Sequence, residues 1–292
     1  MLKITAYHCP TTLQEAVELL ADEGRTVIAG GTDLLVNPRY MVGMREVVDI
    51  RALSLNYIHE EHSELRIGAG ATMRTVAQNL IAQKLANGIL ARGAAVCGSP
   101  NIRNMATLAG NVASALPSAD TLPSLLALDA QVVLVSTRGE RIVPLTTFFV
   151  GPAKTVREHE LIRELRIAIP PTKEQVHGGF YKIGRTAEDI SVVNAATVLT
   201  IQNGRITGAR IVLGAVAPVP LPISSAEVAL IGQTPTEELF QHVATIVRAE
   251  VRPISDQRAS AEYRQRMSGV AIVRALRQAA GLAPQKEEWH HA

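Results

Sequence analysis

The chain has 292 residues, a length that favours two domains of roughly 100–200 residues each. Its composition is 47% apolar and 19% charged, which is typical of a globular protein and excludes a disordered chain. The 29 basic and 27 acidic side chains give a net charge of +2, and aromatic residues make up only 3%. These values exclude a protein that binds nucleic acid through a basic surface or through base-stacking aromatic side chains. No apolar run reaches about 18 residues, and the N-terminus lacks a secretory pattern, so we expect a cytoplasmic protein without a membrane span.

The first part of the chain alternates between strand-like and helix-like patterns. Thr12 and Glu15 form the capping-box pattern of a helix N-terminus, and apolar residues then recur at helical spacing as far as Leu20. The strands expected around this helix are residues 3–7, 26–29 and 46–50. This succession predicts a small parallel α/β unit.

From residue 56 onward, short hairpins and helices replace that pattern. Hairpins are expected at 56–59 with 65–68 and at 131–136 with 141–143, helices at 72–80, 82–95 and 122–128, and a further strand at 165–169. Two prolines, Pro170 and Pro171, end this strand and mark the expected domain boundary. We therefore expect an N-terminal domain over 1–172, with subdomains of about 1–55 and 56–172, and a C-terminal domain over 173–292.

The C-terminal part reads as antiparallel strands followed by helices. Strands are expected at 179–183, 192–202 and 205–216, with Asn203 and Gly204 as a hairpin turn. Pro218, Pro220 and Pro222 are expected to end the sheet, and helices follow at 224–231, 235–250 and 256–280. The predicted fold class is α+β.

Two segments carry the pattern of an anion-binding loop. In the first, a buried strand ends at Gly30 and Gly31 and is followed by Thr32 and Asp33. Glycines let backbone N–H groups turn toward an anion, and Thr32 can donate a further hydrogen bond. Taken alone, a strand-to-loop turn capped by Asp33 is the commoner explanation, and the spacing matches neither the Rossmann fingerprint nor the P-loop.

The second segment, residues 98–120, is rich in small, amide and hydroxyl side chains. Gly110 and Asn111 again allow close approach to a backbone, and Asp120 precedes an apolar helix at a position able to hold a sugar hydroxyl. A long irregular loop that caps a helix is the alternative, although so long a loop in a compact domain is usually functional. Two glycine segments in one domain favour a bisphosphate ligand.

Together these segments resemble the FAD-binding (medium) subunits of the molybdenum hydroxylases, the family of xanthine dehydrogenase and carbon monoxide dehydrogenase. The A-G-G-T-D-L-L signature stands at 29–35, and T-L-A-G-N at 107–111 follows the lead-in I-R-N-M-A at 102–106. P-S-A-D occupies 117–120, and 180–190 resembles the family's F-x-K…R…D-I segment. The resemblance covers nearly the whole chain.

The resemblance implies a two-part FAD-binding domain of the vanillyl-alcohol-oxidase (PCMH) type, followed by a C-terminal domain of antiparallel sheet and helices. It implies that one side of the FAD pyrophosphate contacts Val27, Ile28, Ala29, Gly30, Gly31, Thr32, Asp33 and Leu34, and the other Thr107, Leu108, Ala109, Gly110 and Asn111. Asp120 would contact ribityl or ribose hydroxyls, Ile162 the isoalloxazine ring, and Lys182 the ring carbonyls. No catalytic side chain and no metal ligand are expected in this chain.

Five residues in or near these motifs carry expectations of their own. Lys182 lies in an apolar strand, where its charge is costly unless an anion pairs with it, and the alternative is an edge-strand lysine that extends to solvent. Arg185 and Asp189 are expected to form a structural ion pair. Cys97 is expected to be a packing residue, and Ala109 replaces a glycine of the family pattern.

The function that the resemblance implies is electron transfer. A large molybdopterin subunit would oxidise the substrate, and a small subunit with two 2Fe–2S clusters would pass electrons to FAD in this chain. FAD would then reduce NAD, a quinone or dioxygen, and the complex would be a dimer of heterotrimers. The alternatives are a stand-alone FAD oxidoreductase of the same fold, for which no acid or base is evident, and a non-catalytic adapter that has lost FAD.

Overall fold

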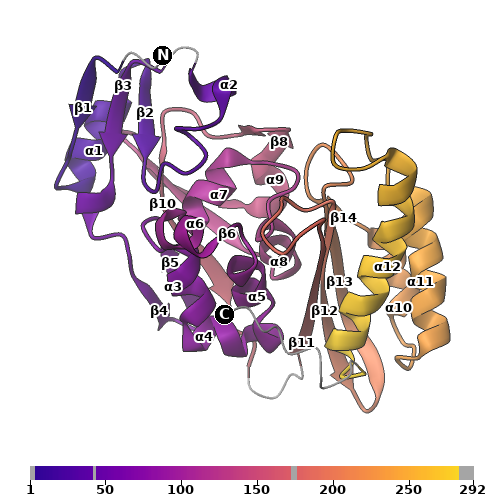
Figure 1. Ribbon diagram of the computed structural model, residues 1–292. Coiled ribbons are helices and arrows are strands. Elements are labelled where there is room, and N and C mark those ends of the chain that lie inside the picture. The colour runs from indigo at the N-terminus through magenta and orange to yellow at the C-terminus, as the bar shows by residue number, and fades with distance from the viewer. Residues whose placement is uncertain (1–3, 42–43, 172–175, 283–292) are drawn as a thin grey trace.

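The computed structural model describes residues 4–41, 44–171 and 176–282, which form three successive groups of strands and helices (Figure 1). The first group is a parallel sheet in the order β1–β3–β2, made of β1 (Ala6–His8), β2 (Arg25–Ile28) and β3 (Glu46–Asp49). Helix α1 (Leu13–Leu20) joins β1 to β2. Its start confirms the capping pattern, because the Glu15 N–H donates to the Thr12 hydroxyl and the Glu15 carboxylate accepts from the Thr11 N–H.

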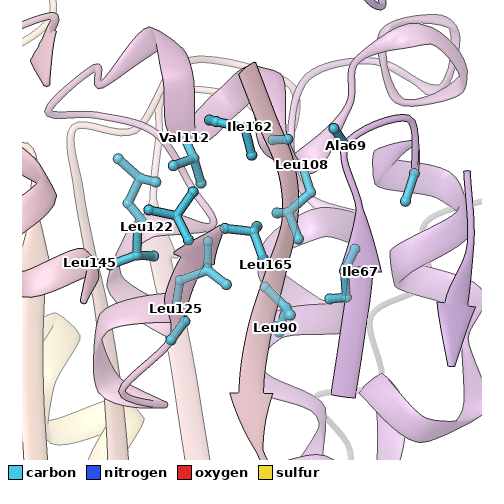
Figure 2. Close-up of a cluster of buried hydrophobic side chains, with 14 of the residues drawn as sticks. Ile67, Ala69, Leu90, Leu108, Val112, Leu122, Leu125, Leu145, Ile162 and Leu165 are labelled. Carbon is cyan, nitrogen blue, oxygen red and sulfur yellow. The ribbon is translucent and has the colours of Figure 1, made fainter. Parts of the chain in front are cut away.

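The second group is built on an antiparallel sheet in the order β4–β5–β10–β6–β7. Its strands are β4 (Ile58–Glu61), β5 (Glu64–Gly68), β6 (Gln131–Ser136), β7 (Gly139–Pro144) and β10 (Leu161–Ala168). Helices α5 (Ile89–Ala95), α7 (Leu108–Ser114) and α8 (Leu122–Ala127) contribute to the same buried core as the sheet. Figure 2 shows the labelled side chains of this core: Ile67, Ala69, Leu90, Leu108, Val112, Leu122, Leu125, Leu145, Ile162 and Leu165.

The helix predicted over 82–95 is interrupted. The structure has α4 (Leu80–Lys84), a 3₁₀ helix η2 (Leu85–Gly88) and α5 in its place. Ala86, Asn87 and Gly88 adopt φ angles of 44°, 55° and 73°, in the left-handed region that Asn and Gly tolerate best. Apolar residues recur at helical spacing on both sides of this turn, so the sequence predicts one continuous helix.

The segment predicted as a long loop contains two short helices, α6 (Pro100–Met105) and α7. Ser99 and Thr107 cap them, because their hydroxyls accept the N–H groups of Ile102 and Gly110. Helices of six and seven residues are too short to leave a periodic pattern, which is why the sequence did not reveal them.

The third group is an antiparallel sheet in the order β11–β12–β13–β14, with helices packed on it. Its elements are β11 (Val176–Ile183), β12 (Val193–Gln202), β13 (Arg205–Gly214), β14 (Leu221–Pro222), α10 (Ser224–Leu230), α11 (Glu237–Glu250) and α12 (Ala261–Ala279). Helix α12 packs on β11 and β12, while α8 of the second group contacts β12 and β13. Pro218, Pro220 and Pro222 are expected to end the sheet, but Leu221 and Pro222 add a short edge strand, a position where the missing N–H of proline is tolerated.

Helix α3 (Met73–Gln78) confirms the helix expected over 72–80 in a shortened form, because Leu80 already belongs to α4. The remaining elements are short, and the sequence did not predict them: α2 (Pro38–Met41), η1 (Arg51–Leu53), α9 (Leu145–Phe148), β8 (Phe149–Gly151) and β9 (Lys154–Thr155). The α+β class is confirmed. The boundary predicted between 172 and 173 lies outside the described residues. Among the helices of the described ranges, none is both long and apolar enough to cross a membrane.

Candidate cofactor site

A cavity of about 590 Å³ lies between the loop that follows β2 and the helices α6 and α7 of the second group. This volume is within the usual range for small-molecule sites, about 300–1,000 Å³. Among the predicted residues, the wall contains Val27, Ile28, Ala29, Gly30, Gly31, Thr32, Asp33, Leu34, Thr107, Ala109, Gly110, Asn111, Asp120 and Ile162. Leu108 and Lys182 are absent from this wall. The structure thus brings both glycine segments to one cavity, although they are some 75 residues apart in sequence.

The first glycine segment, residues 29–34, needs its glycines for two different reasons. A Cβ on Gly30 would lie 1.9 Å from the carbonyl oxygen of Met105, because the loop packs directly on the end of α6. Gly31 has a φ of +67°, a conformation that side chains rarely adopt. Among the described residues, no hydrogen-bond acceptor is found for the backbone N–H groups of 31–33, which therefore remain available at the cavity wall.

The second glycine segment, residues 107–111, is the first turn of α7. Leu108 is fully buried and lies among the core side chains (Figure 2). It is absent from the cavity wall and anchors the segment to the core. Ala109 replaces the family glycine without strain, since its backbone is helical and accommodates a Cβ. The amide oxygen of Asn111 accepts the Thr121 hydroxyl at 2.6 Å, which fixes the Asn111 side chain in the wall.

Asp120 in the cavity wall and Lys182 behind it form a buried ion pair. The Lys182 Nζ donates to Asp120 Oδ2 at 2.8 Å and to the Val96 carbonyl at 2.9 Å, and the Lys182 side chain is only 5% exposed. The alternative of a lysine that extends to solvent is therefore wrong. Ser191 Oγ and Asn194 Nδ2 donate to the other carboxylate oxygen at 2.5 and 3.2 Å. Burial raises the pKa of the Asp120 carboxyl, while the Lys182 ammonium and these hydrogen bonds act in the opposite direction.

Two further parts of the wall were missed at the sequence level. Most of 157–161 enters from the loop before β10 and from its first residue, and the Glu160 carboxylate in this stretch is held by Arg141 through contacts of 2.6 and 2.7 Å. Glu188, Asp189 and Ile190 enter from the loop after β11. The third family motif contained these last residues, whereas no sequence pattern marked 157–161. The predicted ion pair between Arg185 and Asp189 is confirmed at 3.1 Å.

Cys97 also lines the cavity, and burial raises the pKa of its thiol to about 12. An ordinary thiol has a pKa of about 8.5, so the reactive thiolate of Cys97 is scarce near neutral pH. We expect Cys97 to react on the order of 100-fold more slowly than the exposed Cys9 with a disulfide reagent, after allowance for the higher nucleophilicity of a basic thiolate. The measurement is the rate of thiol release in Cys9→Ser and Cys97→Ser variants without cofactor; equal rates would contradict it.

Comparison with known proteins gives matches over almost the whole chain. Residues 2–172 match the FAD binding domain in molybdopterin dehydrogenase, and 179–279 match the CO dehydrogenase flavoprotein C-terminal domain. The xanthine dehydrogenase FAD-binding subunit of Escherichia coli is 32% identical over 96% of this chain and 99% of its own. The carbon monoxide dehydrogenase medium chain of Afipia carboxidovorans is 32% identical over 94% of this chain and 96% of its own.

Solved structures agree with these matches. A carbon monoxide dehydrogenase chain from Hydrogenophaga pseudoflava superposes with a TM-score of 0.90 at 30% identity, covering 97% of this chain and 100% of the other. A chain of quinoline 2-oxidoreductase from Pseudomonas putida 86 gives a TM-score of 0.89 at 29% identity, with 97% and 99% coverage. The resemblance seen in the signatures is confirmed, and the chain belongs to the family of FAD-binding subunits of molybdenum-containing dehydrogenases.

Proposed function

We propose that this chain holds FAD in the 590 Å³ cavity and transfers electrons as the flavoprotein subunit of a molybdenum hydroxylase. The observation that carries the proposal is that both family signatures meet in the wall of one cavity. The N–H groups of 31–33 and the Thr32 hydroxyl fit a pyrophosphate, since they are unpaired donors among the described residues. The close packing of Gly30 on α6 holds these donors in place for the same ligand, because a Cβ on residue 30 would displace the loop.

The other side chains of the wall, together with Lys182 behind it, would bind and orient the cofactor. Val27, Ile28 and Ile162 are apolar and exclude water, with Ile162 proposed to lie against the isoalloxazine ring. Asp120 is proposed to meet sugar hydroxyls, and Lys182, held at 2.8 Å from it, to supply positive charge near the ring carbonyls. When bound, FAD supplies the redox chemistry, accepting electrons and passing them on singly or in pairs.

The partners in this proposal follow from the relatives. We propose a large molybdopterin subunit and a small subunit with two 2Fe–2S clusters, assembled with this chain as a cytoplasmic dimer of heterotrimers. Relatives named as a xanthine dehydrogenase FAD-binding subunit and a carbon monoxide dehydrogenase medium chain support the presence of further subunits. The final electron acceptor would be NAD, a quinone or dioxygen.

The test is a visible absorption spectrum and a metal analysis of the native protein, purified without overproduction of this chain alone. We expect flavin bands together with iron–sulfur absorbance, and molybdenum in the same fractions. Flavin without either metal would overturn the complex and favour a stand-alone FAD oxidoreductase. A colourless protein that takes up no added FAD would overturn the whole proposal and favour the adapter.

A further inference from the structure

Asp33 poses an electrostatic problem in the proposed cofactor site. It belongs to the glycine segment whose N–H groups fit a pyrophosphate, and it lines the same cavity. An ionised carboxylate that faced two charged phosphates would repel them, more strongly in a partly desolvated cavity than in water. The position of its oxygens therefore decides what Asp33 does.

Both carboxylate oxygens are engaged by other side chains of the protein. Oδ2 accepts the Ser114 hydroxyl at 2.8 Å and Arg39 Nη2 at 3.3 Å, and Oδ1 accepts Asn37 Nδ2 at 3.3 Å. The Arg39 guanidinium thus compensates the negative charge of Asp33. Such contacts direct the carboxylate toward the protein and leave the backbone N–H groups of 31–33 to meet an anion.

Ser114 connects this cluster to the other wall of the cavity. It is the last residue of α7, the helix that begins with the second glycine segment, and lies 81 positions from Asp33 in sequence. Its carbonyl oxygen accepts Arg39 Nη2 at 3.4 Å, so Asp33, Arg39 and Ser114 each contact the other two. A carbonyl at the end of a helix lacks an intrahelical partner, and here Arg39 supplies one.

Two contacts consequently join the glycine segments across the cavity. Gly30 packs against the Met105 carbonyl at the end of α6, and Asp33 binds Ser114 at the end of α7. Along the chain, Gly31 and Thr32 lie between Gly30 and Asp33, and the segment 107–111 lies between Met105 and Ser114. Both contacts hold the two segments at a fixed separation through groups of the protein itself, which lowers the cost of ordering them on binding.

We infer that Asp33 is a positioning residue: through Ser114 and Arg39 it clamps the two glycine segments at the separation that the cofactor requires, and it is not itself a ligand of the pyrophosphate. The inference rests on the proposed FAD site and adds a role for a residue that the signature alone assigns to direct contact. Ser114, which no sequence motif singled out, becomes part of the site.

A double-mutant cycle tests the clamp through FAD affinity, measured by quenching of flavin fluorescence on titration into the cofactor-free full-length chain. We expect Asp33→Ala and Ser114→Ala each to weaken binding about tenfold, because each removes a hydrogen bond to a charged group. The double variant should bind about as weakly as the weaker single variant, since both changes break one contact. Ser114→Thr keeps the hydroxyl and should restore affinity to within about twofold.

The controls separate the outcomes. Ser136→Ala removes a hydroxyl at the end of β6, outside the cavity wall, and should leave affinity unchanged. Thermal unfolding of each cofactor-free variant shows whether the fold persists. Multiplicative effects of about a hundredfold in the double variant, or tighter binding by Asp33→Asn as expected for a carboxylate facing phosphate, would overturn the clamp. Failure of the unaltered chain to bind FAD would instead overturn the proposed function.

Discussion

Replacing Lys182 with methionine should lower the free energy of unfolding by about 3–5 kcal/mol, because it leaves the Asp120 carboxylate buried without its countercharge. Both side chains of this pair are almost completely buried, at 5% and 6% exposure, so water cannot replace the lost ammonium. Methionine preserves much of the length and apolar volume of the lysine stem, and the loss therefore reports the charge. The measurement is equilibrium unfolding in urea of the cofactor-free chain.

Arg185→Met provides the matched control. It removes the same kind of charge from the ion pair with Asp189, but the Arg185 side chain is 61% exposed. Exposed pairs contribute about 0–1 kcal/mol, so this variant should be nearly as stable as the unaltered chain. The double variant Lys182→Met with Asp120→Asn should recover part of the loss, because no unpaired charge remains. Equal stabilities of the Lys182 and Arg185 variants would show that the buried pair is not needed for folding.

Gly30→Ala should weaken FAD binding by at least about 100-fold, which corresponds to about 3 kcal/mol. The added Cβ would lie 1.9 Å from the Met105 carbonyl oxygen, far inside van der Waals contact, and that oxygen belongs to backbone that cannot rotate away. The loop must therefore move off α6 and carry the donors of 31–33 with it. Flavin fluorescence titration of the cofactor-free protein measures the loss.

Gly151→Ala is the control for this change. Gly151 lies in β8 outside the cavity, and a Cβ there would be 3.9 Å from the nearest atom, an ordinary contact. Both substitutions add one methyl group to a segment outside the helices. They differ in that only the methyl group on residue 30 would overlap a neighbouring backbone atom. Unaltered FAD affinity in Gly30→Ala would mean that the contact with α6 does not position the glycine segment.

Local chemistry made much of the fold predictable. The Thr12 cap, the periodic helices α11 and α12, and the turn at Asn203 and Gly204 all depend on neighbours within a few residues. Asn203 and Gly204 have φ angles of 51° and 73°, as their left-handed hairpin turn requires. The predicted counterion of Lys182 also followed from local reasoning, since an apolar strand makes an unpaired ammonium costly.

The parts that escaped prediction depend on tertiary contacts or on very short elements. Residues 157–161 enter the cavity wall only because β10 pairs between β5 and β6, which no motif in that stretch indicates. The partner of Asp33 lies 81 positions away, at the end of a helix too short to be recognised. Likewise, the break at Asn87 and Gly88 lies within a run whose apolar spacing is helical on both sides.

The side chains that bind the Asp120 carboxylate are synthesised later than Asp120 itself. All three side chains that hold its carboxylate belong to the third group, and Lys182 and Asn194 follow it by 62 and 74 positions. During translation, Asp120 therefore leaves the ribosome well before its partners exist, and its carboxylate stays hydrated until the C-terminal sheet folds. The wall of the cavity is completed only after Asn194 has been synthesised, so cofactor loading follows the synthesis of about two thirds of the polypeptide.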